Sequence, residues 1–313
     1  MQQIKAWIDT LGYKDYKVEM VGGDASFRKY FRLILGEKQS FIIMDSSADK
    51  ESLYPFIDIS VRLLKAKVEV PRIVAQNIED GYLLITDLGS RHLADVLSPM
   101  SVELLYMKGI HEVLKIQEAD TTNLEVYDKE FLLYEMGFMQ EWYLNEHLKQ
   151  SLNEIEQSVL ENTLELIASE VLSQPQGYFV HRDFHSRNIM METGRKLVII
   201  DYQDARKGAL TYDLVSILKD VYVRFDSKQM ETLALEFKVL KGIKVSDEEF
   251  IRWFDFTGLQ RHLKILGIFS RLDIRDGKSR YLEDIPLTLE YIYEVCEKYD
   301  ELNALGEFLK NRL

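Results

Sequence analysis

The chain has 313 residues, of which 46% are hydrophobic, so it is long enough to bury the core of one large domain or of two lobes. Its formal net charge of −13 argues against a nucleic-acid partner, because neutralising phosphates needs clustered lysine and arginine side chains. The single cysteine, Cys296, excludes an intrachain disulfide and fits a reducing compartment, and no apolar run approaches the roughly 18 residues of a membrane span.

The N-terminal part of the sequence predicts a small, mostly antiparallel sheet that carries one helix. An amphipathic helix at 2–12 comes first and ends at Gly12. Apolar runs bounded by turn residues then predict five strands, at 16–21, 27–35, 40–45, 70–76 and 81–87. Helical spacing predicts a helix over 53–67, with Pro55 early in it, where the missing N–H costs least.

After a short linker at 88–92 the pattern changes from strands to helices. The predicted helices lie at 101–119, 129–148, 154–172 and again from residue 211 to the C-terminus. Strand-like runs interrupt them between Tyr178 and Ile200, where a loop and a small hairpin are expected. The sequence therefore predicts an α+β protein of two lobes, residues 1–88 and 89–313, with a cleft between them.

The segment VHRDFHSRNIM carries the residues with the clearest chemistry. Phosphoryl transfer needs a carboxylate that orients and deprotonates the attacking hydroxyl, and oxygen ligands that hold Mg²⁺ on the phosphates. The protein-kinase catalytic loop supplies them with H-R-D, four residues and N, followed by a metal-binding aspartate. Here the triplet HRD ends at Asp183, Asn188 has the required spacing, and Asp201 ends an apolar strand after the predicted hairpin. We predict that Asp183 is the base and that Asn188 and Asp201 bind Mg²⁺.

A metal hydrolase is the alternative interpretation of the same segment. His181 and His185 are four residues apart, which would place both on one face of a helix. The preceding GYFV predicts a strand, however, and the glutamate of H-E-x-x-H is missing, so we expect His181 to be buried and to steady the loop. Asp213, in TYDL, is explained equally well as a helix N-cap that supports the loop and as a chemical group.

The order HRDFHSRN, VIIDYQDA, TYDL resembles the aminoglycoside-phosphotransferase and choline-kinase superfamily, which are small-molecule kinases with a protein-kinase-like two-lobe fold. Segments between Gly22 and Pro286, such as GGDASFRKYFRL and RWFDFTGLQRHLK, are similar to bacterial cell-wall amino-sugar kinases. The resemblance implies a small antiparallel-sheet lobe that binds ATP and a larger helical lobe. It also implies Mg²⁺-dependent transfer of phosphate to the anomeric hydroxyl of N-acetylmuramic acid or N-acetylglucosamine in peptidoglycan recycling.

The resemblance also assigns the nucleotide contacts. The turn GGDAS would cover the phosphates, with Ser26 and neighbouring amides reaching the triphosphate, and the backbone of Thr86 and Leu88 would face adenine. Protein kinases hold the phosphates with a lysine on the third strand, whereas this strand, SFIIMD, has Met44 in that region. Arg28, beside the turn, is the candidate for the missing cation, and a solvated strand residue is the alternative.

The acceptor is predicted to be a small molecule. Only YQDARKGALTY separates the metal aspartate from Asp213, and A-P-E is missing, so a peptide has no platform on which to dock. Gln260 and Lys264 are four residues apart on one helix face, with Arg261 beside them. Such a face would bind sugar hydroxyls and a lactyl carboxylate, and a solvated helix face explains it equally well. Asp204 is also assigned to the acceptor.

An amino-sugar kinase is thus the first hypothesis, with a small-molecule sugar as its only partner. A kinase for aminoglycosides, choline or amino alcohols is the second, although a cationic acceptor needs an acidic pocket and the proposed face is basic. A nucleotide-binding regulator without turnover is the third, suggested by the missing strand lysine but opposed by the intact catalytic residues. Because the N-terminus is polar rather than like a signal peptide, we expect a cytoplasmic protein without membrane or protein partners.

Overall fold

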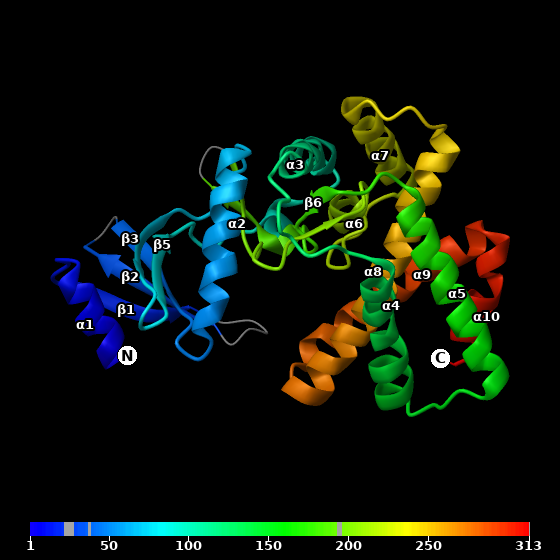
Figure 1. The fold of residues 1–313 in the computed structure, drawn as a ribbon, viewed down its shortest axis with the longest axis horizontal. Coiled ribbons are helices and arrows are strands. Elements are labelled where there is room, and N and C mark those ends of the chain that lie inside the picture. The colour runs from blue at the N-terminus through cyan, green and yellow to red at the C-terminus, as the bar shows by residue number, and fades with distance from the viewer. Residues whose placement is uncertain (22–27, 37–38, 193–195, 313) are drawn as a thin grey trace. The chain divides into compact units, whose positions relative to one another are not determined.

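The computed structural model describes residues 1–21, 28–36, 39–192 and 196–312. The chain forms two compact units (Figure 1). The first consists of Met1–His92 and Ile189–Asp204, and the second of Leu93–Asn188 and Ala205–Leu313. The division into residues 1–88 and 89–313 stays a prediction about two functional lobes, and the structure adds a later hairpin segment to the first unit.

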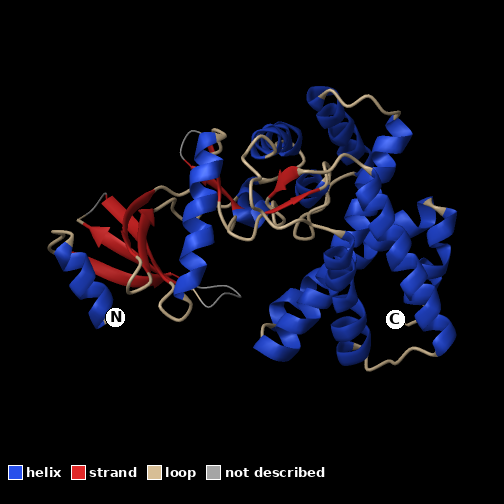
Figure 2. Cartoon of the chain, in the orientation of Figure 1, coloured by secondary structure: helices blue, strands red, loops and turns tan. Residues whose placement is uncertain are grey.

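The first unit contains a five-stranded sheet whose neighbouring strands are all antiparallel, which confirms the predicted sheet (Figure 2). In spatial order the strands are β1 (Tyr16–Val21), β2 (Lys29–Leu35), β3 (Gln39–Asp45), β5 (Tyr82–Thr86) and β4 (Ile73–Asn77). Two helices accompany the sheet, α1 (Gln2–Thr10) and α2 (Leu53–Lys65), and a 3₁₀ turn, η1 (Lys50–Ser52), precedes α2. Ile4 and Ile8 of α1 pack with Leu33 and Ile43 of the sheet in one apolar cluster. Alternate strand residues thus form the core of this unit.

A hairpin that comes much later in the sequence completes the first unit. It pairs β7 (Ile189–Glu192) with β8 (Lys196–Ile199), as the sequence predicts. Backbone hydrogen bonds join it to the N-terminal part of the unit, from Met191 N to the Arg91 carbonyl (2.8 Å) and from Ile199 N to the Glu69 carbonyl (2.8 Å).

The second unit is helical, apart from a short antiparallel pair of strands, β6 (Tyr178–Val180) and β9 (Arg206–Gly208). Its longer helices are α3 (Val102–Ile116), α4 (Lys129–Phe138), α5 (Glu154–Ser173), α6 (Tyr212–Leu218), α7 (Ser227–Lys241), α8 (Asp247–Asp276), α9 (Ile285–Lys298) and α10 (Asn303–Lys310). A π-helical segment, η3 (Met139–His147), continues α4, and short 3₁₀ turns lie at η2 (Leu93–Val96), η4 (Ser186–Asn188), η5 (Ser279–Asp284) and η6 (Asp300–Leu302). The single helix expected over 129–148 is therefore divided into two segments.

Helix α8 is the centre of the second unit (Figure 1). It begins at the N-cap Ser246, whose side chain accepts a hydrogen bond from Glu249 N, and it ends at Gly277 with φ of +67°. Nearly every residue from Phe250 to Leu272 is buried, because α4, α5, α6, α7 and α9 all pack around it. Even its polar residues are therefore inside the protein.

The contact between α4 and α8 depends on a glycine. A Cβ atom at Gly267 would lie 2.2 Å from the carbonyl carbon of Phe138, so no larger residue fits without moving one helix. This close approach brings polar side chains of α4 against those of α8. No helix in the part of the chain described here combines the length and the hydropathy of a membrane span.

Candidate active site

The loop that follows β6 carries Asp183, and a buried carboxylate holds its first part. Asp213, in the first turn of α6, accepts hydrogen bonds from His181 N (2.7 Å) and Arg182 N (3.0 Å). The N-cap of α6 is Thr211, so Asp213 does not cap the helix as expected. Asp213 supports the loop instead through the hydrogen bonds that it accepts from the loop backbone. Burial raises the pKa of this carboxyl, and the two N–H donors and His181 act against that rise.

A second buried carboxylate, Asp220, holds the other end of the loop. It accepts hydrogen bonds from Ser186 N (2.8 Å) and from Tyr222 N (2.9 Å). Asp220 lies just beyond the end of α6, and no motif in the sequence marks it. Asp183 thus lies between two anchored segments.

Three cationic side chains, those of Lys264, Arg261 and Arg182, act on the carboxylate of Asp183. Arg261 Nη1 donates to the Arg182 carbonyl (2.6 Å) and contacts Asp183 Oδ1 (3.3 Å). Burial raises the pKa of Asp183, but Lys264, Arg261 and Arg182 lower it more strongly, so the pKa lies well below its usual range. The carboxylate is therefore ionised at neutral pH, while its side chain remains 40% exposed.

Glu135 of α4 balances two of these cations. Its carboxylate pairs with Arg182 and with Lys264 (3.1 Å), and it accepts a hydrogen bond from Tyr127, whose hydroxyl lies 2.7 Å from that of Tyr212. Burial raises the pKa of Glu135, but Lys264 and Arg182 lower it more, so the group is a buried anion. No sequence motif marked this residue, because its partners lie far away in the chain.

The predicted polar face of α8 is buried rather than solvated. Gln260, Arg261 and Lys264 are 3% exposed or less. Arg261 and Lys264 are already paired with Asp183 and Glu135, respectively. Neither the nitrogen nor the oxygen of the Gln260 amide has a hydrogen-bond partner among the described residues. Such a group calls for an ordered water or a ligand.

Asn188 lies at the end of the same loop, in η4. Its Nδ2 donates to the Asp183 carbonyl (3.0 Å) and lies 3.3 Å from Nε2 of His185. Burial and Arg261 lower the pKa of His185 to about 3, so the ring is neutral. His181 is buried, as expected, and its ring packs on Phe184. In the described ranges no three His, Cys, Asp or Glu side chains are grouped to hold a metal.

In the first unit, Asp201 follows β8 with φ of +63°, a conformation that residues other than glycine adopt at a cost. Gln203 Nε2 donates to Asp201 Oδ1 (3.0 Å) and to Asp204 Oδ2 (3.0 Å), so one amide joins the two carboxylates. The role of Asp204 at the acceptor stays a prediction. Because Gln203 joins Asp204 to Asp201, the structure suggests a second role for Asp204, close to a bound metal.

A cavity of about 270 Å³ in this unit brings Asp204 together with another predicted site residue, Arg28. It is lined by Arg28, Ser46, Asp49, Ser52, Pro55, Gln203 and Asp204. Arg28 Nη2 donates to the Ser52 carbonyl (3.3 Å), and the Ser46 hydroxyl is buried without a hydrogen-bond partner among the described residues. A guanidinium and an unsatisfied hydroxyl fit a phosphate group, and the neighbouring carboxylates fit a divalent cation that accompanies it. The strand β3, QSFIIMD, contains no lysine, and Met44 in it is fully buried, so the expected departure from the strand lysine of protein kinases is present.

The remaining nucleotide candidates are less informative. Thr86 ends β5, and its backbone N–H and side-chain hydroxyl bond the backbone of Arg72. Leu88 follows Asp87, which no motif in the sequence marked. The Asp87 carboxylate binds Arg32 (2.6 Å) and so ties this linker to the sheet. Ser26 lies outside the described residues.

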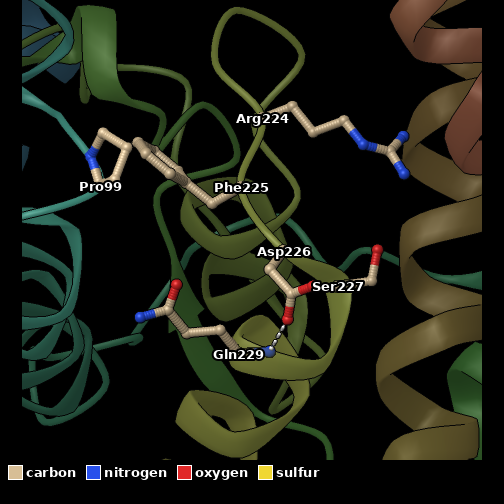
Figure 3. A pocket seen from close by; sticks show the side chains of 6 residues that line it. All are labelled: Pro99, Arg224, Phe225, Asp226, Ser227 and Gln229. Carbon is tan, nitrogen blue, oxygen red and sulfur yellow. Dashed lines mark hydrogen bonds between the residues drawn. The ribbon is translucent and has the colours of Figure 1, made fainter.

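A larger hollow of about 580 Å³ lies in the second unit and contains no predicted site residue (Figure 3). It is lined by Pro99, Arg224, Phe225, Asp226, Ser227 and Gln229. Arg224 pairs with Glu290 (3.0 Å). Asp226 caps α7 by accepting a hydrogen bond from Gln229 N (2.9 Å), which Figure 3 shows as a dashed line. The charged groups that line this hollow are thus already engaged in an ion pair and in a helix cap.

Comparisons with known proteins agree with this arrangement. Residues 17–253 match the sequence model of the phosphotransferase enzyme family. An N-acetylmuramate/N-acetylglucosamine kinase of Pseudomonas aeruginosa is 34% identical, over 98% of this chain and 95% of the relative. A kinase of the same name from Neisseria meningitidis is 33% identical, over 98% and 94%.

Two solved structures show the same fold at low sequence identity. One is an ADP-bound aminoglycoside phosphotransferase, with a TM-score of 0.62, 13% identity and coverage of 94% of this chain and 98% of that one. The other is a choline kinase from Streptococcus pneumoniae, with a TM-score of 0.62, 16% identity and coverage of 93% and 99%. These likenesses confirm the predicted protein-kinase-like α+β fold.

Proposed function

This chain belongs to the phosphotransferase enzyme family, and on that premise we propose that it is an ATP-dependent kinase of the anomeric hydroxyl of an amino sugar, N-acetylmuramic acid or N-acetylglucosamine. The observation that carries the proposal is the identity of 34% and 33% with two kinases of that name, over nearly the full length of each chain. Asp183, Asn188 and Asp201, which phosphoryl transfer requires, are all in place in the sequence.

Asp183 is assigned as the group that orients the attacking hydroxyl and accepts its proton. Its lowered pKa makes it a weak base, so the proton moves late, as the bond to phosphorus forms. This suits a loose transition state, in which positioning contributes more than deprotonation. An anomeric hydroxyl loses its proton more readily than an ordinary alcohol, so a weak base is sufficient.

Arg28 and Ser46 are assigned to the phosphates of ATP, and Asn188 and Asp201 to Mg²⁺. When bound, the nucleotide supplies the phosphoryl group and the metal neutralises charge on the phosphates. Arg28 thereby replaces the strand lysine of protein kinases. Ser26 and the backbone at Thr86 and Leu88 keep their predicted roles at the triphosphate and adenine, respectively.

The acceptor assignments follow from what each side chain already contacts. Arg261 and Lys264 lower the pKa of Asp183 and so keep its carboxylate ionised. We therefore assign them to position Asp183 rather than to contact the acceptor. Gln260 keeps its predicted role at the acceptor, because a hydroxyl or a bridging water would satisfy its buried amide. A cationic acceptor such as choline is disfavoured, because three cations surround the catalytic carboxylate.

The test is a nucleotide-consumption screen of the purified protein against sugars, aminoglycosides and amino alcohols, followed by phosphorus NMR of the product. We expect turnover of the two N-acetylated sugars, phosphate coupled to the anomeric proton and loss of that phosphate in mild acid. A 1-O-methyl glycoside, which has no anomeric hydroxyl, should be inert. Equal consumption of that glycoside would refute the anomeric assignment, and turnover only of amino alcohols would refute the sugar assignment.

A further inference from the structure

Arg187 in η4 differs from the cations that surround Asp183. The side chains of Arg182, Arg261 and Lys264 are 15% exposed or less and are paired with buried or partly buried carboxylates. The side chain of Arg187 is 47% exposed. Its Nη1 lies 3.9 Å from Asp284 Oδ2, a distance that is too long for a hydrogen bond. Arg187 is therefore a cation of the catalytic loop whose donors remain accessible.

The guanidinium of Arg187 is held in place by an aromatic ring. Its central carbon lies 3.7 Å from the centroid of the Tyr222 ring. The His185 ring packs edge-on against Tyr222, with centroids 5.0 Å apart. Stacking leaves the in-plane N–H groups of a guanidinium available for a ligand, and it reduces the conformational entropy that binding would cost.

Asp220 fixes this platform relative to the catalytic loop. Its carboxylate accepts hydrogen bonds from Ser186 N, one residue before Arg187, and from Tyr222 N. The stacked arginine and its ring are thus anchored by the same buried group, on a loop that contains Asp183 four residues earlier. Arg187 and Asp183 are thus carried by one short loop whose two ends are held by buried carboxylates, so the position of Arg187 relative to the loop is preorganised.

We propose that Arg187 binds the carboxylate of an acidic acceptor sugar and thereby favours N-acetylmuramic acid over N-acetylglucosamine. This inference rests on the proposed function and adds the residue that determines specificity. N-acetylmuramic acid carries a lactyl carboxylate that N-acetylglucosamine lacks, and a guanidinium binds a carboxylate through two parallel hydrogen bonds. Lys264 and Arg261, which the sequence suggested for this contact, are neutralised by Glu135 and Asp183.

The test compares kcat/KM for the two sugars in Arg187→Met, Arg187→Lys and wild type. Removing hydrogen bonds to a charged group should lower kcat/KM for N-acetylmuramic acid by about 10-fold to 100-fold. In Arg187→Met the kcat/KM for N-acetylglucosamine should change by less than about twofold. Arg187→Lys should retain part of the preference, because lysine still offers a positive charge but cannot form two parallel hydrogen bonds. Arg224→Met is the matched control, because Arg224 also lies over a tyrosine ring, Tyr291 (5.1 Å), outside the proposed site.

Equal losses of kcat/KM on both sugars, with an unchanged melting temperature, would overturn the specificity role of Arg187. So would unchanged values on both, or an Arg224→Met variant that shifts the preference as strongly. If the wild-type protein phosphorylates neither sugar, the proposed function itself is wrong, and this inference is refuted along with it. Activity of the wild type on both sugars therefore shows that a negative result with the variants concerns Arg187 and not the proposed function.

Discussion

The charged groups around Asp183 and the polar groups of the cavity around Arg28 differ in how far the protein itself satisfies them. Around Asp183, Glu135 balances Arg182 and Lys264 while Arg261 contacts the catalytic carboxylate itself. Around Arg28, by contrast, the Ser46 hydroxyl is buried and lacks a partner among the described residues. The charges around Asp183 are thus balanced within the protein, which keeps the electrostatics of the catalytic loop preorganised, whereas the cavity around Arg28 contains a buried hydroxyl with capacity for a ligand. Substitutions in the two regions should therefore have different signatures.

The largest effect is expected from Asp183→Asn, which removes the base and retains its shape. The kcat should fall by about 10²–10⁴, while nucleotide affinity stays within about twofold of wild type. Steady-state kinetics and nucleotide titration measure the two quantities separately. A variant with near-normal turnover would show that Asp183 is not the catalytic group.

The next largest effect is expected on stability, from Glu135→Gln. This substitution leaves Arg182 and Lys264 buried without their counter-charge, which should lower the free energy of unfolding by about 3–5 kcal/mol in urea. The control is Glu165→Gln, which breaks an ion pair with Lys129 in which both side chains are 49% exposed and which should cost less than about 1 kcal/mol.

The stability lost in Glu135→Gln should also depend on pH. Burial raises the pKa of Glu135, but Lys264 and Arg182 lower it more, so that it falls below the ordinary value of 4.5. A carboxyl with a lowered pKa stabilises the fold above its ordinary value, and that contribution disappears as pH falls through the folded-state pKa. The difference between wild type and variant should therefore be full at pH 7 and shrink below pH 4.5. A difference that is independent of pH would exclude the ionic role.

On the other side of the comparison, Asp201→Asn should affect metal dependence and leave the fold intact. Asparagine tolerates the left-handed conformation of this position, where φ is +63°, so the backbone is preserved. Loss of one anionic oxygen should raise the Mg²⁺ concentration for half-maximal rate by at least about 10-fold, with an unchanged melting temperature. If a chelator does not reduce wild-type turnover, the metal assignment is wrong.

Sequence reasoning succeeded where the signal is local. Hydrophobic periodicity predicted the antiparallel sheet and the helical unit. The candidates Asp183 and Asn188 lie five positions apart on one loop, and their catalytic roles stay predictions. It missed Glu135 and Asp220, because what marks them is burial against segments far away in the chain. The polar stripe on α8 resembles a solvated face in sequence, but Gly267 lets α4 approach and buries it. Tertiary packing decided these positions.

The smallest effect is expected from Ser46→Ala, and its sign is what makes it informative. The Ser46 hydroxyl is buried without a partner among the described residues, so its removal should leave the ligand-free protein equally stable or slightly more stable. If the hydroxyl binds a phosphate, KM for ATP should nevertheless rise by about 3-fold to 10-fold. Ser40→Ala is the control, because the Ser40 hydroxyl donates to Asp87 (2.7 Å), and losing that bond should lower the melting temperature. A destabilised Ser46→Ala variant with unchanged KM would show that Ser46 serves the fold rather than the nucleotide, and would remove the contrast between the two regions.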